Sequence, residues 1–437
     1  MKIQLKVLVV SRDSWNTTNN SGNTLTNLFQ NWDSSSIATI YCRDELPDTA
    51  ICTNFFKISE SLLVKKLFGK VKVAGEKHGV LVSNSTVINE DQIQLQNSEK
   101  KFYDFFRKNR WHLFLWLREI LWKIVNWRTA ELKQFIDDFK PDIIYSPSYD
   151  SFYMHSLLYF IRKNSNAKVV YFHCDDLVTY RQHSFSPFFW INRLILRKYM
   201  DKSIQMADKN YCIIDEQAKV YEGIYKTQFD LLYKTGTFDI QPVVKKPEAI
   251  IKFVYTGNII YGRLETIIAI AKTLEQINCN GKKAELHIYT ANTIEQKDIE
   301  FFQKTNSVQL MGKVSYNAIP KILNDADVLL HVESFEKHQK LATSLSFSTK
   351  LVDYFEAGKP IFAIGWENAA SIKYLKNNSI GVTVNSPNDL TNEILSLIDS
   401  RDSFGAIGSA LWQFGKEHHN TSFVLANFEE QLAKMTT

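Results

Sequence analysis

Short apolar segments alternate with longer amphipathic ones along most of this chain, and the alternation begins within its first residues. The apolar segments are rich in β-branched and aromatic residues, which favour strands buried on both faces of a sheet. In the first half they cover residues 6–10, 37–42, 142–146, 168–172 and 210–214. Helical periodicity between them, starting at 22–31, predicts a parallel sheet covered by helices.

A second series of the same kind follows an interruption at residues 235–249, where Gly, Pro and Lys break both the helix and the strand period. Its expected strands cover residues 252–256, 285–289, 308–311, 327–332, 361–364 and 381–384. A helical segment lies beyond them. We therefore predict an α/β protein with two Rossmann-like domains, residues 1–236 and 250–402, and a C-terminal helix, 403–437, that packs back on the first domain.

The composition agrees with two domains and narrows the class of protein. A chain of 437 residues is long enough for two cores, and a formal net charge of +5 is too small to demand a nucleic-acid partner. The five cysteines are scattered without a CxxC pair, which favours a reducing compartment over disulfides or structural zinc. The apolar N-terminus carries charges and lacks a cleavage site, and no run of about 18 uncharged apolar residues occurs. We expect a cytoplasmic protein without a spanning helix.

Residues 347–363 combine a loop, a short helix, a stop signal and a buried strand. Ser348 or Thr349 can cap the helix by accepting a hydrogen bond from a free backbone N–H, and Gly358 supplies the left-handed residue that ends it. Lys350 adds a positive charge to the first turn, where unpaired N–H groups favour a phosphate or diphosphate. Capped helices of this kind also occur without any ligand, so an ordinary structural role stays open.

Two further positions suit the same ligand chemistry. Asp353 lies one turn further into this helix, where its carboxylate can accept hydrogen bonds from sugar or ribose hydroxyls. In the turn at 255–265, Gly257 lets the backbone approach a ligand, and Arg263 can bind a diphosphate with its planar guanidinium. The turn lacks the GxGxxG spacing, so a nicotinamide cofactor gains no support, and a solvated turn is the alternative.

Four segments in a fixed order resemble the nucleotide-sugar domain of bacterial GT-B glycosyltransferases of the family-four type, which build capsule, exopolysaccharide and lipopolysaccharide. They are Tyr-Thr-Gly-Asn-Ile at 255–259, residues 308–320, residues 324–330 and Ser-Thr-Lys-Leu-Val-Asp-Tyr-Phe-Glu-Ala-Gly-Lys-Pro at 348–360. The resemblance implies two domains facing each other across a cleft and a UDP- or GDP-linked sugar as donor, with no separate cofactor. It also implies a glycan or lipid-linked acceptor and retention of anomeric configuration.

The resemblance assigns roles to a set of residues in the second domain. They are Gly257, Asn258, Arg263, Lys313, Val314, Ser348, Thr349, Lys350 and Asp353. By resemblance, Arg263 and the 348–350 loop hold the donor diphosphate. The backbone near Lys313 and Val314 meets the base, and Asp353 takes the place of the family's ribose-binding glutamate.

The chain departs from the family at Leu345, where a paired glutamate often stands eight residues before the position of Asp353. The loop 333–340 contains acidic residues that could replace it. Two other functions stay open. One is a sugar-nucleotide epimerase on the same two-domain plan, which would need acid–base carboxylates in the cleft. The other is a catalytically silent GT-B protein that binds a partner transferase.

Two loops of the first domain are candidates for the acceptor side. Gly22 and Asn23 open a helix after a polar loop, as the family's glycine loop does beneath the donor diphosphate and the acceptor. His173 and the pair Asp175 and Asp176 follow a strand end, where open α/β sheets place ligands. By resemblance His173 faces the cleft and supports transfer, while Asp175 or Asp176 orients an acceptor hydroxyl. The alternative is a structural histidine.

Two remaining patterns bear on metals and membranes. Asp325-Ala-Asp327 matches the DxD metal signature of the other large glycosyltransferase fold, but its place between a helix and a buried strand favours a chance match, so we expect no catalytic metal. The stretches 100–127 and 185–202 mix aromatic and basic residues at helical spacing. They are either ordinary core-facing helices or helices on a membrane surface, and the second interpretation predicts a peripheral protein with a lipid-linked acceptor.

Overall fold

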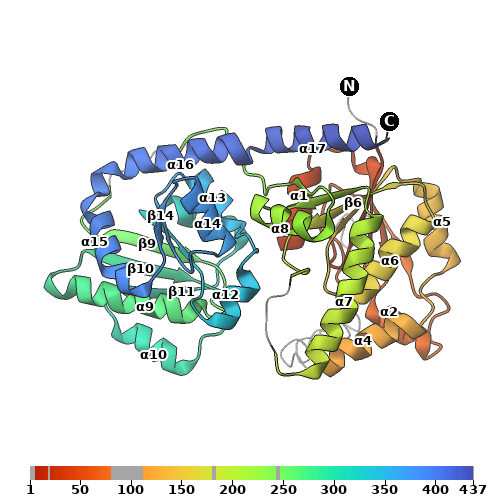
Figure 1. Ribbon diagram of the computed structural model, residues 1–437, viewed down its shortest axis with the longest axis horizontal. Coiled ribbons are helices and arrows are strands. Elements are labelled where there is room, and N and C mark those ends of the chain that lie inside the picture. The colour runs from red at the N-terminus through yellow and green to blue at the C-terminus, as the bar shows by residue number, and fades with distance from the viewer. Residues whose placement is uncertain (1–4, 18–19, 80–111, 180–183, 243–246, 437) are drawn as a thin grey trace, which may run out of the picture.

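The computed structural model describes residues 5–17, 20–79, 112–179, 184–242 and 247–436. It contains two α/β domains, each built on a mainly parallel sheet with helices on both faces (Figure 1). The predicted fold class, two Rossmann-like domains, is therefore confirmed.

The first sheet has the strand order β4-β3-β2-β1-β5-β6-β7-β8, and only β4 runs antiparallel to its neighbour. The strands are β1 (Val7–Ser11), β2 (Ile37–Tyr41), β3 (Asn54–Lys57), β4 (Glu76–His78), β5 (Ile143–Pro147), β6 (Lys168–His173), β7 (Lys209–Cys212) and β8 (Asp230–Leu231). The helices are α1 (Asn20–Phe29), α2 (Glu60–Leu67), α4 (His112–Ile124), α5 (Ala130–Phe139), α6 (Phe152–Lys163), α7 (Pro187–Met206) and α8 (Asp215–Tyr225). The central strand β1 is buried throughout, as its uninterrupted Val-Leu-Val-Val run requires.

The second sheet is wholly parallel, with the order β11-β10-β9-β12-β13-β14. The strands are β9 (Ile251–Thr256), β10 (Ala284–Tyr289), β11 (Val308–Gly312), β12 (Val328–Val332), β13 (Ile361–Ile364) and β14 (Val382–Val384). The helices are α9 (Arg263–Ile277), α10 (Gln296–Lys304), α11 (Ile319–Asn324), α12 (Lys337–Thr343), α13 (Lys350–Ala357), α14 (Ala370–Asn377) and α15 (Leu390–Asp399). The order reverses between β9 and β12, and open α/β sheets bind ligands beyond the carboxyl ends of strands at such a point.

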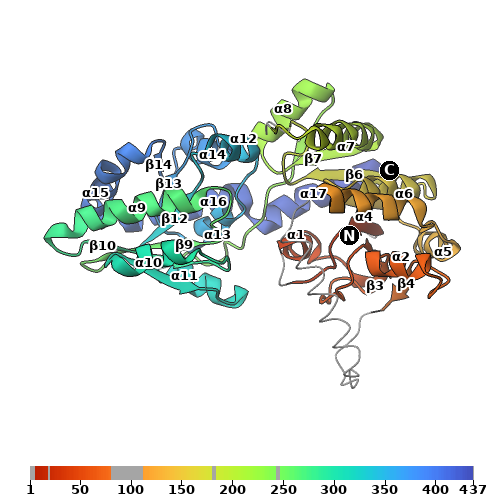
Figure 2. The ribbon, with the colours of Figure 1, turned by 90° about the horizontal axis from the view of Figure 1, so that it is seen from below.

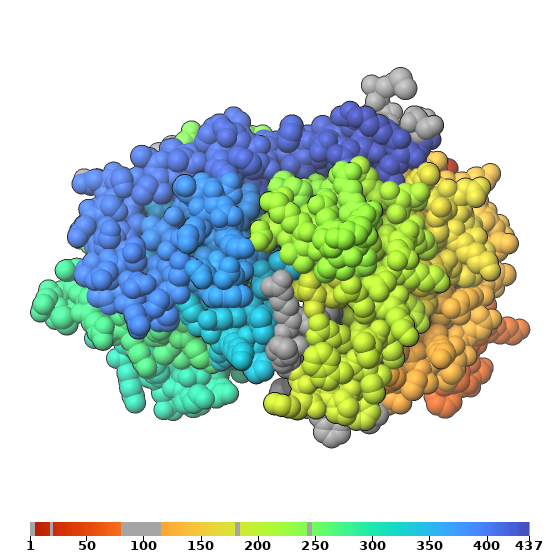
Figure 3. Space-filling view, in the orientation of Figure 1, coloured from red at the N-terminus to blue at the C-terminus, as the bar shows by residue number. Residues whose placement is uncertain are grey.

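The C-terminal segment differs from its prediction because it forms two helices instead of one. Helix α16 (Phe404–His419) packs on α13 of the second domain, where Phe414 lies 5.5 Å from Phe355 between ring centroids. Helix α17 (Thr421–Thr436) crosses to the first domain, and its Phe428 ring lies 5.5 Å from Tyr211 of β7. The two helices form one band over both domains (Figures 1 and 3).

The two basic aromatic stretches divide between core and surface. Trp122 and Trp127 are only 2% and 1% exposed, so these rings belong to the core of the first domain, which corrects the expectation that they insert into headgroups. Other apolar side chains of α4 and α7 are exposed. Figure 2 shows both helices in the first domain. Residues 100–111, which include Trp111, are outside the described residues.

Candidate functional site

The predicted donor residues of the second domain meet at the switch point between β9 and β12. Gly257 and Asn258 follow β9, and Arg263 begins α9. Lys350, the first residue of α13, lies on the opposite side of the β9 end. The structure thus brings together the two cations that the sequence predicted as a diphosphate site.

Arg263 is held by three hydrogen bonds. Its Nη2 donates to Oε2 of Glu333 at 3.0 Å, its Nη1 to Oδ1 of Asn258 at 2.8 Å, and its Nε to the Val332 carbonyl at 3.1 Å. These partners come from the ends of β9 and β12. A guanidinium fixed in this way keeps further N–H groups available for an anion, because it carries more donors than these partners use.

Lys350 is held just as closely from the other side. Its Nζ donates to the Thr256 carbonyl at 2.9 Å and lies 5.2 Å from the centre of the Tyr255 ring. Gly257 makes this approach possible, because its φ is +142° and a Cβ there would lie 2.1 Å from the amine. Burial, with a contribution from Arg263, lowers the pKa of Lys350 to about 8.

Glu333 is the carboxylate that contacts Arg263 and interacts electrostatically with Lys350, and the sequence placed it only within a loop that could replace the missing glutamate. It is 3% exposed, and burial raises its pKa while Arg263 and Lys350 oppose that rise. His331, two residues earlier on β12, is also buried, and burial with both cations lowers its pKa far below the ordinary value. Glu333 directly follows the buried strand β12, and this position was the sequence signal that could have identified it as a site residue.

The start of α13 departs from its prediction in one detail. Thr349 occupies the cap position with helical backbone angles, and neither its side chain nor that of Ser348 caps the helix. Instead, the Ser348 N–H donates to Oγ of Ser371 at 2.8 Å. The predicted end is confirmed, since Gly358 has φ +57° and follows the last helical residue.

Asp353 has a partner that the sequence did not indicate. Its Oδ1 accepts a hydrogen bond from Nζ of Lys234, in the segment that leaves the first domain. One turn later Glu356 accepts a bond from the Thr237 N–H, and burial raises the pKa of Glu356 to about 7. The face of α13 that carries Asp353 therefore binds the interdomain connection in this structure, and ribose binding by Asp353 stays a prediction.

The loop predicted to meet the base lies opposite the predicted glycine loop. Lys313 and Val314 directly follow β11, and Lys313 is exposed. Beyond them, the hydroxyl of Tyr316 accepts a hydrogen bond from Nδ2 of Asn23 at 2.6 Å across the two domains. Gly22 is buried at the start of α1, where a Cβ would lie 2.0 Å from the Asn16 carbonyl oxygen. Gly22 therefore allows the close packing that positions Asn23.

His173 does not face the cleft. Its side chain is fully buried beneath Tyr171, Tyr221 and Phe229, with ring centroids 4.9 to 5.6 Å away. Burial lowers the pKa of His173 to about 3, so the ring is neutral at ordinary pH. The expectation of a cleft-facing histidine is corrected because the last residue of β6 points into the helical layer. His173 is therefore a structural histidine of the core, which was the alternative interpretation.

The two aspartates after His173 have different surroundings. Asp176 accepts hydrogen bonds from the Val178 and Thr179 N–H groups and from the Tyr221 hydroxyl, so it fixes a turn. Asp175 is exposed as a whole residue, but desolvation of its carboxyl group raises its pKa, and a hydrogen bond with the Ser346 side chain of the second domain opposes that rise. Asp175 therefore faces the boundary between the domains, and its role toward an acceptor stays a prediction.

Leu345, at the position of the family's paired glutamate, is buried. It lines a cavity of about 280 Å³ between the domains, together with Val220 and Trp366. An ion pair of 2.6 Å between Lys373 and Glu216 lies at the same cavity and joins the domains. A buried apolar side chain thus stands at this position, in a cavity that both apolar and charged residues line.

The described residues contain no group of three or more His, Cys, Asp or Glu side chains placed to hold a metal ion. Asp327 of the DxD pattern accepts a hydrogen bond from the Lys252 N–H at 2.8 Å and so connects the starts of β12 and β9. Within the part of the chain that the structure covers, no helix combines the length and the apolar composition needed to cross a bilayer.

No protein-family model matches this chain, and no curated protein matches it in sequence. Many solved structures share its fold. HepE of Anabaena, solved with UDP and glucose, is 11% identical, with a TM-score of 0.62 over 98% of this chain and 100% of HepE. Sucrose-phosphate synthase of Thermosynechococcus elongatus is 12% identical, with a TM-score of 0.61 over 99% of each chain. A UDP-forming trehalose-phosphate synthase of Burkholderia xenovorans is 10% identical, with a TM-score of 0.59 over 98% of this chain and 100% of that enzyme.

This chain therefore has the two-domain GT-B fold of those glycosyltransferases. The identities are low, so the likeness concerns the fold, and the chemistry is argued from the site.

Proposed function

We propose that this protein is a glycosyltransferase that moves a sugar from a nucleotide-diphosphate sugar to a glycan or lipid-linked oligosaccharide. The cluster of Arg263, Lys350 and Glu333 at the β9–β12 switch point carries the proposal. Two partly buried cations beside the one carboxylate of Glu333 leave a positive charge that a diphosphate would compensate. UDP is the first nucleotide to test, because HepE of the same fold was solved with it.

The proposed reaction breaks the bond between the anomeric carbon and the diphosphate and forms one between that carbon and an acceptor hydroxyl. Arg263, Lys350 and the N-terminus of α13 stabilise the charge that develops on the leaving diphosphate. Asp175 orients the hydroxyl from the first domain, and the hydroxyl proton passes to an oxygen of the departing diphosphate. We also propose that the transfer retains the anomeric configuration and serves cell-surface polysaccharide synthesis. Both parts of the proposal rest on the family-four resemblance.

We further propose that the enzyme works peripherally on the inner face of the cytoplasmic membrane. Exposed apolar side chains on α4 and α7 support this location. Leu117, Ile120 and Ile124 follow one face of α4, with exposed fractions of 46% to 63%. Phe188 and Leu194 of α7 are 61% and 65% exposed. Apolar side chains on neighbouring surface helices can insert at the level of lipid headgroups.

Two measurements test the transferase. A thermal-shift panel of nucleoside diphosphates should identify one that raises the melting temperature of the parent protein and has a smaller effect on Arg263→Ala. The matching sugar donor should then release nucleotide slowly alone and rapidly with an acceptor. An epimerase would convert the donor without releasing nucleotide, and a silent partner protein would leave it unchanged. Either result would overturn the proposal.

A further inference from the structure

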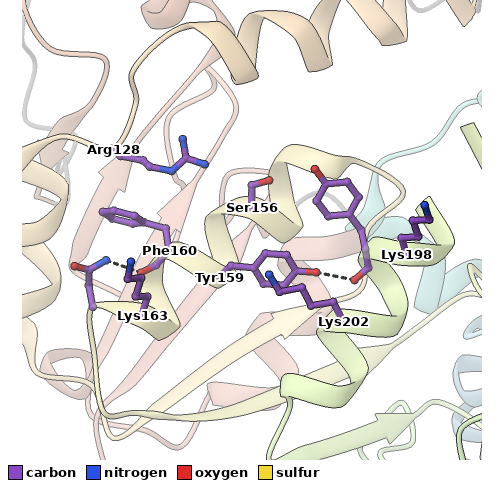
Figure 4. Close-up of a pocket in the computed structure, with 9 residues that line it drawn as sticks. Arg128, Ser156, Tyr159, Phe160, Lys163, Lys198 and Lys202 are labelled. Atoms are coloured by element: carbon purple, nitrogen blue, oxygen red, sulfur yellow. Dashed lines mark hydrogen bonds between the residues drawn. The ribbon is translucent and has the colours of Figure 1, made fainter. Parts of the chain in front are cut away.

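A cavity of about 640 Å³ lies between α6 and α7 of the first domain, and its lining residues are separate from those of the donor cluster (Figure 4). Four cationic side chains line it. Lys163 comes from the end of α6, Lys198 and Lys202 from α7, and Arg128 from the segment between α4 and α5. No acidic residue lines the cavity.

These four cations are left without carboxylate partners in the described part of the chain. Lys202 lies 4.3 Å from the centre of the Tyr159 ring, and Arg128 lies 4.2 Å from that of Trp127, so aromatic faces position two of the four cations. A neighbour on α7 shows the contrast, since Arg197 pairs with Asp201 at 2.7 Å. The four cationic side chains are exposed to solvent, and together they give the cavity a positive potential that attracts anions.

The floor of the cavity is rigid. The Tyr159 hydroxyl donates to the Tyr199 carbonyl at 2.7 Å and accepts from Oγ of Ser203 at 3.1 Å. The Tyr199 ring lies between Phe152 and Tyr159, with interplanar angles of 6° and 9°. These contacts fix α6 against α7, so the cations of both helices keep their spacing without a ligand, which lowers the entropic cost of binding one.

The outer face of α7 changes from apolar to basic where it reaches the cavity. Ile191, Leu194, Lys198 and Lys202 are spaced by three and four residues, so they share one side of the helix. Ile191 and Leu194 are 46% and 65% exposed. Ile124, the last residue of α4, is 63% exposed and stands four residues before Arg128 in the chain. An anion pocket with exposed apolar side chains beside it fits an amphiphilic anion.

We propose that this cavity binds the phosphate headgroup of a membrane lipid, and specifically a headgroup with more than one negative charge, such as a phosphomonoester. Four cations around one open cavity exceed what a singly charged headgroup needs, while diffuse attraction to an anionic surface requires no cavity. The inference rests on the membrane location proposed above and adds a discrete, saturable site to it.

The test compares two kinds of vesicle adjusted to the same zeta potential. One contains phosphatidic acid in phosphatidylcholine and the other phosphatidylserine in phosphatidylcholine. The parent protein should bind the phosphatidic acid vesicles more tightly. Two variants remove equal charge: the first changes Arg128, Lys198 and Lys202 to Gln, and the control changes Lys133, Lys304 and Lys321 to Gln. The first should lose the preference and bind phosphatidic acid roughly tenfold more weakly or worse, while the control keeps it.

Other outcomes overturn the inference. Equal binding to both vesicles, reduced alike in both variants, would show diffuse electrostatic attraction without a headgroup site. Inorganic diphosphate or glycerol phosphate that raises the melting temperature of the parent but not of the cavity variant, without a phosphatidic acid preference, would assign the cavity to a soluble phosphate. Circular dichroism melting checks that both variants fold. A UDP-induced thermal shift of the parent protein tests the proposed transferase independently, so the two failures are distinguishable.

Discussion

Glu333 makes it possible to bury two cations beside each other. Arg263 and Lys350 both contact the end of β9, and without a carboxylate their mutual repulsion and desolvation would oppose folding. One carboxylate between two cations leaves the site with a net positive charge before any donor arrives. We therefore expect the donor diphosphate to accept hydrogen bonds from the N–H groups of Arg263 and Lys350 that Glu333 and the backbone do not use.

The first prediction concerns these two cations. Arg263→Ala and Lys350→Ala should each raise the dissociation constant of UDP by about tenfold or more, because a charge-assisted hydrogen bond contributes roughly 1.5–3 kcal/mol. Isothermal titration calorimetry measures this directly. Lys304→Ala, an exposed change in α10, is the matched control and should leave affinity unchanged. Unchanged affinity in both site variants would refute the assignment.

The second prediction uses the titration of Lys350. Since burial and Arg263 lower its pKa to about 8, the amine is charged below that pH and loses its charge above it. Affinity for UDP should hold up to about pH 8 and then fall by as much as tenfold per pH unit, because binding requires the proton. Lys350→Arg stays charged throughout and should lack this fall. An equal fall in both proteins would assign the titration to another group.

His173 gives a third prediction, now about stability instead of turnover. Its pKa is lowered to about 3 by burial, so between its ordinary value near 6.5 and about 3 the unfolded chain binds a proton that the folded one does not. The free energy of unfolding should therefore decrease as the pH is lowered across that window, by up to about 1.4 kcal/mol per pH unit from this residue. His173→Phe, which keeps a ring in place, should flatten the slope measured by urea unfolding. A large loss of turnover in a fully stable variant would instead restore a catalytic role.

At the scale of elements, α13 serves both the donor site and the interdomain connection. Its first residue, Lys350, contacts the end of β9, and its last turn is followed by Gly358, which packs against the connection and α16. Between them Asp353 and Glu356 bind Lys234 and the Thr237 backbone. Movement of the connection is therefore transmitted to the helix that presents its N-terminus to the diphosphate.

The fourth prediction separates two roles of Asp353. Asp353→Asn and Lys234→Gln both break the ion pair between α13 and the connection. If the carboxylate also contacts ribose, only Asp353→Asn should weaken UDP binding strongly, by about tenfold, while Lys234→Gln has a small effect. Competition titrations with UDP and with a ribose phosphate that lacks uracil would show whether the lost affinity comes from the ribose. Equal effects of both changes would show that Asp353 acts through the connection alone.

At the scale of the whole molecule, the sequence predicted the sheets better than the site. Each expected strand of the second domain lies within one residue of the observed one, because runs such as 361–364 have no polar position to shift their boundaries. Three strands of the first domain were missed, β3, β4 and β8, which are only four, three and two residues long. Gly257 and Lys350 were found because special backbone angles and helix starts are local properties.

The surroundings of other site residues depend on how the helices and strands pack in space, and residue spacing along the chain does not give that packing. The burial of His173 depends on where α8 places Tyr221, and the partner of Asp353 lies 119 residues away. The role of Glu333 required β9 and β12 to be neighbours. Sequence patterns therefore predicted which residues could bind a diphosphate, while tertiary packing decided which of them are free to do so.

Helix α17 has a consequence for the order in which the chain can fold during synthesis. The Tyr145 and Tyr211 rings of the first sheet pack against Phe428, and Gln431 accepts the Tyr211 hydroxyl bond at 2.9 Å. A nascent first domain therefore emerges from the ribosome with this face of its sheet uncovered, and it stays so until the whole second domain has been translated. Chaperone binding to that face should persist through this interval, and the closing hydrogen bond between Tyr211 and Gln431 must be made across 220 positions of the chain.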